Sequence, residues 1–525
     1  MSEPRVSISQ KELNTLRDSV QTLTAENEEL KRKLERMNEL LLNAQRARFG
    51  QSSEKRDYVM PNQLGLFNEA EAEQNAKEEE PTEETFTVKE HKRKKKRTVE
   101  ELTEDLPVRE VVLKLPDELL TCGCGAKMVP IGKKFLRQEL DVIPKQVYRV
   151  LYYLETYACK ECEKKTGYAN IAQVRPPRPL MKHSLASPSA VADVMTQKYA
   201  DGIPLYRQEK IWKRDGVALS RATLANWVIQ CAQTWLKPLY RQMRKALPEE
   251  TVIYADETVV QVLKEDGKPA TSESRMWVYA SGRYSQKQIR LFEYQPDRSG
   301  KHPARLLKDF HGCLVTDGYA GYNQVEGAIR CGCWAHMRRK WREAMPKGAT
   351  TATSKAAIGY EYCNKLFALE RKFADLIPKR REEARHGKIE FLLDAYWSWV
   401  EKLDPTPGSK LAEAATYAKG QKQYLNAFLE HGEVEISNNT AENAIRPFVV
   451  GRKNWLFSDT PKGADSSAII YTLVESAKAN GLEPYLYLRC LLEELRFFES
   501  TPPAADLEAF MPWSPMIPTL LDKYK

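Results

Sequence analysis

A heptad repeat near the N-terminus is the feature that most constrains the fold of this chain. Two mostly apolar series recur every seven residues and are offset by three: Leu13, Val20, Asn27, Leu34 and Leu41, and Leu16, Leu23, Leu30 and Met37. A helix with such a seam buries it against a partner helix. Asn27, a polar residue within the seam, favours a parallel two-stranded pairing in one register. Residues 1–50 are therefore predicted to form a coiled-coil helix that joins chains into a homodimer or higher oligomer. A helix packed on its own domain is the alternative.

Length and composition indicate a multidomain globular protein. The 525 residues correspond to three or four units at about 150 residues each. No apolar run approaches the roughly 18 residues of a membrane span, and the N-terminus lacks the pattern of a secretory signal. We therefore expect a cytoplasmic protein with no membrane partner. An excess of 81 Lys and Arg over 72 Asp and Glu permits a polyanionic partner without proving one.

Residues 51–105 are predicted to be a charged, flexible linker. The stretch 69–84 is acidic, and the run 92–97 consists only of Lys and Arg. The basic run could neutralise DNA phosphates, or it could be a solvated tail; both interpretations stay open.

Two cysteine pairs predict a structural zinc site in residues 106–178. They are Cys122 and Cys124, and Cys159 and Cys162, with an alternating apolar stretch at 146–153 between them. In a cytosolic chain, two such pairs beside short strands suit tetrahedral Zn²⁺ in a zinc-ribbon-like module. Four thiolates leave no open position for catalysis, so the role would be structural. Unliganded cysteines are the alternative.

A helical DNA-binding module is predicted at 180–247. The pattern indicates helices over 188–199, 205–215 and 221–235, with a Gly-containing turn and Ser220 as the N-cap of the last one. This is a helix-turn-helix candidate, in which Arg221, Thr223 and Asn226 would face bases or phosphates. An ordinary helical hairpin has the same spacing.

Strands follow from residue 250, and two acids are expected at their ends. The strands are predicted at 251–255, 276–281, 288–294, 313–316 and 329–334. Asp256 and Asp317 directly follow the first and fourth, where a sheet holds functional groups in place while loops leave them accessible.

A third acid, Glu442, is predicted in a short helix that Ser437 or Asn438 could cap and Pro447 would end. Asn439 and Arg446 share its face by spacing. Three carboxylates brought together would repel one another unless divalent cations neutralise them, and two such ions about 4 Å apart can catalyse phosphoryl transfer. Spacing alone does not show that the acids converge.

Several longer stretches closely resemble the transposases of bacterial insertion-sequence family sixty-six. They are ARFGQSSEKRD (47–57), DETVVQVL (256–263), TDGYAGYN (316–323), CGCWAHMRRKW (331–341) and the long segment 438–481. The resemblance extends over nearly the whole chain, except that the first cysteine pair is C-x-C where that family more often has C-x-x-C. It implies a DDE recombinase with catalytic Asp256, Asp317 and Glu442.

The resemblance also implies an overall architecture, which is multidomain α+β. An RNase H-like α/β catalytic core would occupy 248–345 and 433–482, interrupted by a helical insertion at 346–432 and followed by a C-terminal helix and tail at 483–525. The insertion agrees with the helix-rich pattern from 354 to 429.

Further site residues are expected near the acids. His336 lies in a C-x-x-H element of a kind found in several transposase families, and could contact the scissile phosphate or orient a metal-bound group; a hydrogen-bonded core histidine is the alternative. The expected DNA contacts are Arg338, Arg339, Arg446, Arg452, Lys453 and Trp455. For the last four, the alternative is a solvated helix end with Trp455 buried.

The sequence therefore predicts a transposase that cleaves element ends and transfers strands into target DNA with two Mg²⁺ ions, or Mn²⁺ in their place. Its partners would be double-stranded DNA in the bacterial nucleoid and, by resemblance, small accessory proteins of the same element. The alternatives are a DNA-binding regulator or domesticated relative without chemistry, and a metal-dependent nuclease that cleaves without joining.

Overall fold

The computed structural model divides into two compact units, residues 1–44 with 146–525, and residues 45–145. It describes residues 11–12, 14–27, 29, 33, 37, 108, 134–135, 145–168, 170–346, 350–498 and 502–524. The predicted linker 51–105 and the pair Cys122 and Cys124 lie outside the described residues. No helix among the described ranges is both long and apolar enough to cross a bilayer.

The described part of the N-terminal segment is helical, as the heptad repeat predicts. Residues 11–12, 14–27, 29, 33 and 37 all have helical backbone. Three seam residues, Leu16, Val20 and Leu23, are more than half exposed. A single chain therefore leaves this apolar seam in water.

The segment that holds the second cysteine pair is a small hairpin. Strands β1 (Thr156–Cys159) and β2 (Asn170–Gln173) pair antiparallel, with helix α4 (Lys160–Thr166) between them. The alternating stretch 146–153 has no regular secondary structure, because no strand among the described residues pairs with it.

The helical module forms largely as its sequence predicts. Its helices are α5 (Pro188–Tyr199), α6 (Leu205–Arg214), α7 (Arg221–Cys231) and α8 (Lys237–Ala246), with a π-helical turn at Ala232–Leu236. Ser220 is the N-cap of α7 and accepts from the Thr223 N–H at 3.1 Å. The helix expected over 221–235 leaves α-geometry after Cys231, because Pro238 has no N–H to continue the ladder.

The centre of the fold is a five-stranded mixed sheet in the order β5-β4-β3-β6-β7. The strands are β3 (Val252–Gln261), β4 (Glu273–Ser281), β5 (Arg290–Gln295), β6 (Cys313–Thr316) and β7 (Ile329–Gly332). The first three form an antiparallel meander, and β6 and β7 add parallel to β3. Short helical segments connect the later strands, at α9 (Lys301–Leu306) and Ala320–Gln324.

Two of the predicted strand bounds are wrong in ways that matter for the site. Strand β3 continues five residues beyond Asp256, since the β-branched run after it also pairs with β4. Strand β7 ends at Gly332, and Trp334 instead begins helix α10 (Trp334–Ala344).

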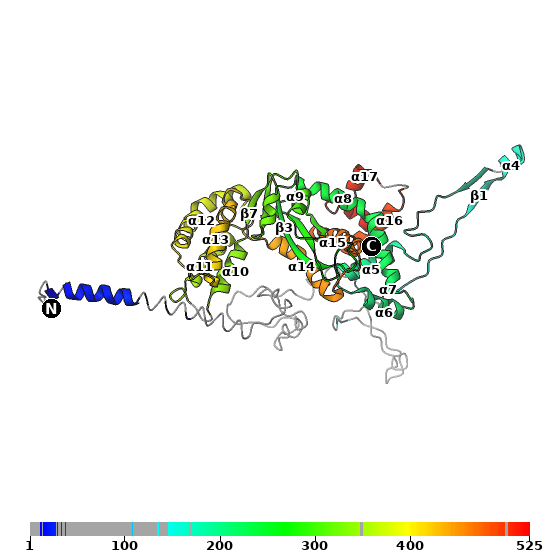
Figure 1. Cartoon of the computed structure of the whole chain (residues 1–525). Coiled ribbons are helices and arrows are strands. Elements are labelled where there is room, and N and C mark those ends of the chain that lie inside the picture. The colour runs from blue at the N-terminus through cyan, green and yellow to red at the C-terminus, as the bar shows by residue number, and fades with distance from the viewer. Residues whose placement is uncertain are drawn as a thin grey trace, which may run out of the picture. The chain divides into compact units, whose positions relative to one another are not determined.

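Helices cover the sheet and one of its edges (Figure 1). Helix α14 (Asn439–Trp455) packs on β3 and β4, and α15 (Pro461–Ala479) packs along β5. The α15 side chains of Thr472 and Ser476 accept hydrogen bonds from backbone N–H groups of β5. An edge strand covered in this way cannot pair with another chain. The prediction that Pro447 ends the Glu442 helix is wrong, because α14 continues through it.

A helical segment lies between α10 and α14. It contains α11 (Lys355–Lys372), α12 (Pro378–Glu401), α13 (Lys410–Asn426) and a short turn at Ala427–Glu430, and α13 packs against β7. The chain ends with α16 (Pro484–Leu495), α17 (Ala504–Glu508) and α18 (Ile517–Asp522), of which α16 packs on α5.

A buried ion network joins this helical segment to the chain that leads into α14. Glu370 on α11 accepts from Arg381 at 2.9 Å and from Arg385 at 2.7 Å, and all three side chains are buried. Arg385 also donates to the carbonyl oxygens of His431 and Val434, at 2.8 and 2.7 Å. Burial would raise the pKa of Glu370, but the two guanidinium groups outweigh it and leave that pKa below its usual value.

We expect Glu370→Gln to lower the free energy of unfolding by about 3–5 kcal/mol near neutral pH, because it leaves two buried cations without their partner. The folded pKa of Glu370 is below its unfolded value, so its contribution is present above about pH 4.3 and is lost as pH falls through the folded pKa. The measurement is denaturant unfolding from pH 7 to pH 3.

The control is Glu383→Gln, which removes an exposed ion pair with Arg380 and should cost about 1 kcal/mol or less. Equal losses for the two variants would contradict a special role for the buried network.

Candidate functional site

Asp256 lies inside β3, where its side chain is close to several charged groups. Glu257, Asp317 and His336 all interact electrostatically with it. Burial, together with repulsion from the two neighbouring acids, raises the pKa of Asp256 to about 8. One oxygen accepts from the Glu257 N–H at 2.9 Å. The carboxylate therefore sits where a positive charge would be strongly favoured.

Asp317 directly follows β6, as predicted, and its loop is held from two sides. Its carboxylate accepts from the Tyr319 N–H at 2.9 Å, and Arg330 on β7 donates to its backbone oxygen at 2.7 Å. A Cβ at Gly318 would overlap the Tyr417 ring of α13. Glycine thus allows α13 to approach the loop that carries the acid.

Glu442 lies in the first turn of α14 and is buried. Its Oε1 has no hydrogen-bond partner among the described residues, and His336 Nδ1 is 3.8 Å from it, beyond hydrogen-bonding distance. Asn439 and Arg446, predicted to share a helix face with Glu442, both lie on α14 and are exposed.

His336, in the first turn of α10, is the residue that links the acids. It interacts electrostatically with Asp256, and its Nδ1 is 3.8 Å from a Glu442 carboxylate oxygen. Burial would lower the pKa of His336, but the Cys333 sulfur and the Glu442 carboxylate raise it to about 9. Donor atoms of Cys333, His336 and Glu442 lie within 4.8 Å of one another.

Asn438 holds the helix of the third acid against the strand of the first. Its side-chain amide donates to the Ala255 carbonyl at 2.9 Å, and its backbone N–H donates to Cys333 Sγ at 3.1 Å. The predicted side-chain cap of α14 does not form, because this amide bonds to β3 instead.

Sequence reasoning missed a second buried acid beside the first. Glu257 accepts from Arg298 Nε at 2.7 Å and from the Tyr322 hydroxyl at 2.6 Å, and Asp317 interacts with it electrostatically. Burial and Asp317 together raise the pKa of Glu257. Because β3 continues past Asp256, alternation places Glu257 on the opposite face of the strand, which a strand predicted to end at residue 255 could not indicate.

Comparison with known proteins identifies the family. A sequence model described as "Transposase IS66 family" matches residues 183–466, more than half of the chain. The chain belongs to the IS66 transposase family. Three further models match: "zinc-finger binding domain of transposase IS66" at 120–163, "IS66 C-terminal element" at 472–513 and "Transposase C of IS166 homeodomain" at 36–111. The predicted resemblance is therefore confirmed.

The relatives of this IS66 family chain include proteins of Sinorhizobium fredii. The uncharacterized protein y4qI is 31% identical over 407 residues, which cover 74% of this chain and 72% of the relative. The uncharacterized protein y4jD is 27% identical, with 79% and 81% covered. A chain of the Drosophila P element transposase strand transfer complex aligns at 12% identity with a TM-score of 0.30, over 58% of this chain and 94% of that one. A likeness this low supports no argument.

The zinc-finger match in this IS66 transposase spans all four predicted ligands and supports zinc binding by the segment. Cys159 is exposed at the end of β1, and Cys162 follows within α4.

Several predicted DNA contacts of the IS66 chain are engaged internally. Arg338 donates to the Tyr360 hydroxyl at 3.1 Å, and Arg452 donates to Thr258 Oγ1 at 3.2 Å. The Trp455 ring is half-buried and packs edge-on against Tyr199. These three side chains contact neighbouring elements in the described structure.

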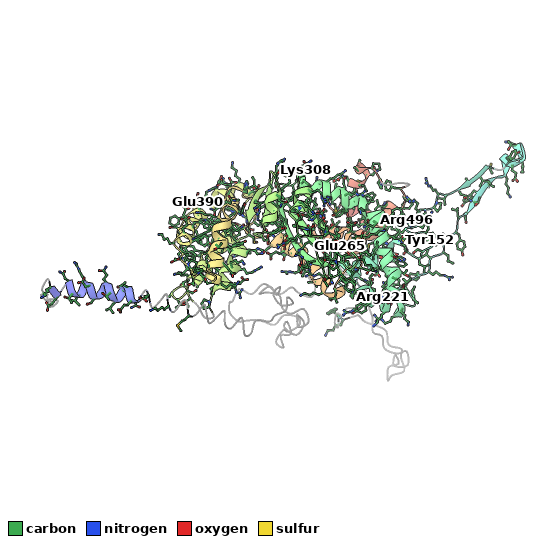
Figure 2. All side chains as sticks on the ribbon, in the orientation of Figure 1. Tyr152, Arg221, Glu265, Lys308, Glu390 and Arg496 are labelled. Carbon is green, nitrogen blue, oxygen red and sulfur yellow. The ribbon has the colours of Figure 1, made fainter. Side chains whose placement is uncertain are left out.

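Other predicted contacts are accessible to a nucleic acid. Arg446 and Lys453 are exposed on α14, and Arg339 is half-buried on α10. Arg221 and Asn226 are exposed on α7, and Arg221 is labelled at the surface in Figure 2. Thr223 is half-buried, and its hydroxyl hydrogen-bonds with Ser220 at 3.0 Å.

We expect Asn438→Ala to destabilise this IS66 transposase by about 1–3 kcal/mol, because it removes the buried partner of the Ala255 carbonyl. Asn443→Ala changes an exposed residue on the same helix and should stay within about 0.5 kcal/mol of the parent. Denaturant unfolding measures both; an unaltered midpoint for Asn438→Ala would show that the link to β3 is dispensable.

Proposed function

We propose that this protein cuts DNA at the ends of an insertion sequence and joins those ends to target DNA by a DDE mechanism with two Mg²⁺ ions. The observation that carries the proposal is the clustering of the predicted acids around His336. Asp256 interacts with Asp317 and His336, and His336 reaches Glu442. These acids come from β3, the end of β6 and the start of α14; 61 positions separate Asp256 from Asp317, and 125 separate Asp317 from Glu442.

The sheet supports an RNase H-like core. An antiparallel three-strand meander is extended by two parallel strands on the side of the first strand. Asp256 lies on β3 and Asp317 lies at the end of β6, and these two strands are neighbours in the sheet. In this proposal α11–α13 are the helical insertion that separates Glu442 from the other two acids.

The residues present fit divalent cations. Glu442 Oε1 is buried without a hydrogen-bond partner among the described residues, and burial together with the neighbouring acids raises the pKa of Asp256. Carboxylate oxygens are the ligands that Mg²⁺ prefers. Asp256, Asp317 and Glu442 would hold the ions, with Mn²⁺ as a substitute. When bound, such ions lower the pKa of a water nucleophile and stabilise a leaving oxygen.

The protein's own groups then position the DNA. Burial lowers the pKa of His336, but Cys333 and Glu442 raise it above its usual value, so His336 could donate a hydrogen bond to a phosphate oxygen. Arg339, Arg446 and Lys453 offer positive charge to the flanking backbone.

The remaining modules would bring the DNA ends to this site. Helices α5, α6 and α7 pack on one another and leave Arg221 and Asn226 exposed for the major groove, in a helix-turn-helix arrangement. Cys122, Cys124, Cys159 and Cys162 would bind a structural Zn²⁺. The heptad seam in residues 13–41 would pair two chains, so that both element ends are held together.

Asp256→Asn should lower Mg²⁺-dependent cleavage of labelled end DNA by about 10³-fold or more, because loss of a shared metal ligand costs several kcal/mol of transition-state stabilisation. Binding of the end DNA should remain within about twofold of the parent. Asp266→Asn, which changes an exposed carboxylate in the β3–β4 turn, is the matched control and should cleave normally.

The same assay with a supercoiled target separates the alternatives. Joined products support a transposase, cuts without joining indicate a nuclease, and band shifts alone indicate a regulator. Cleavage retained by Asp256→Asn would overturn the assignment of the first acid.

Arg221→Ala and Asn226→Ala should each weaken binding of end DNA by about 1–3 kcal/mol, since both side chains are placed for groove contact. Gln230→Ala, at an exposed position near the other end of α7, is the control. If Arg221 contacts a phosphate, Arg221→Ala should also reduce the slope of log K against log salt concentration by about one. Unaltered affinity for both variants would favour an ordinary helical hairpin.

A further inference from the structure

A group of side chains of the types that bind metal ions lies apart from the three acids. Donor atoms of Cys313, His431 and Glu433 are within 4.8 Å of one another. Cys313 begins β6, whereas Asp317 follows the other end of that strand. At about 3.3 Å per residue, the two positions are separated by roughly 13 Å along the strand.

A fourth donor adjoins this group. Cys313 and Val315 point to the same face of β6, and Val315 pairs with Cys331 on β7, so both thiols lie on one face of the sheet. The Cys331 thiol donates to the Ile329 carbonyl at 3.8 Å, and Cys331 interacts electrostatically with both Cys313 and Glu433. Both cysteines are buried and neither is in a disulfide.

The short segment that supplies the other two donors is held in place by packing. A Cβ at Gly432 would overlap the backbone of Pro378 at the start of α12. Arg385 binds the His431 and Val434 carbonyls on either side. His431 and Glu433 are half-buried, and no side-chain hydrogen bond or ion pair engages them within the described ranges.

The donor set selects the metal. Two thiols, an imidazole and a carboxylate suit Zn²⁺, which takes four such ligands at about 2.0–2.3 Å. Tetrahedral ligand atoms at that radius are about 3.3–3.8 Å apart. The donor atoms of Cys313, His431 and Glu433, which lie within 4.8 Å of one another, therefore need only a small contraction. Mg²⁺ is disfavoured, because it prefers oxygen ligands.

The geometry points to a structural zinc centre formed by Cys313, Cys331, His431 and Glu433. It would tie the buried strands β6 and β7 to the segment 431–438, which ends at Asn438 and leads into the helix of Glu442. Such a centre would be separate both from the proposed Mg²⁺ site and from the cysteine pairs at 122–162.

Zinc content of the full chain tests this. A four-serine variant carries Cys122→Ser, Cys124→Ser, Cys159→Ser and Cys162→Ser, and about one Zn²⁺ per chain should remain in it. Co²⁺ substitution of this variant should give the absorption of a tetrahedral thiolate site. Adding His431→Ala or Glu433→Gln should remove that metal and the Co²⁺ bands. Both residues are only half-buried, so these variants should still fold, as circular dichroism can check.

The matched control is His386→Ala, which removes a half-buried histidine of α12 outside the group and should leave the zinc content intact. Added Zn²⁺ should raise the melting temperature of the four-serine protein but not of its His431→Ala derivative. No zinc in the folded four-serine protein, or zinc that persists in both His431→Ala and Glu433→Gln, would overturn the proposal.

Discussion

The arrangement of the acids depends on the buried contacts of Asn438. Its amide binds the carbonyl of Ala255, the residue before the first acid, and its backbone N–H binds the Cys333 sulfur, three residues before His336. Glu442 follows one helical turn later, and its N–H bonds to the Asn438 carbonyl. One residue therefore sets the position of β3, α10 and α14 relative to each other. Because the Asn438 side chain is fully buried, loss of its bond would leave the Ala255 carbonyl without this buried partner, at a cost of about 1–3 kcal/mol.

The helical segment between α10 and α14 is packed onto this arrangement and is more than a long connection. Arg385 binds the chain that leads to Asn438, and its charge is balanced by Glu370 on α11. Tyr417 of α13 packs at Gly318 beside the second acid. Changes in these helices can therefore alter the positions of Asp317 and Glu442 without touching either carboxylate. A buried ion network gives little net stability but penalises any arrangement that separates its charges.

The electrostatics of the site are unbalanced in the absence of cations. Asp256, Glu257 and Asp317 repel one another. Of the nearby basic groups, Arg298 bonds to Glu257, while His336 interacts with Asp256 and with Glu442. A fold that gathers negative charge in a buried place loses stability. Such an arrangement is typical of sites that bind metal ions or other positive charge.

Local helices and the residue types at the site follow from the sequence alone. Apolar periodicity and the Ser220 cap predicted α5 and the start of α7, and the match to the IS66 family follows from the motifs around Asp256, Asp317 and Glu442. Where those elements end, and what lies between the acids, depends on the packing of the whole fold. Strand β3 extends past Asp256 because β4 pairs with it, and α14 continues through Pro447 because packing on β3 and β4 outweighs the lost hydrogen bond. Periodicity reports which face of an element is buried, whereas contacts such as Asn438 with Ala255, or His336 with Glu442, join residues about a hundred or more positions apart and depend on the assembled sheet.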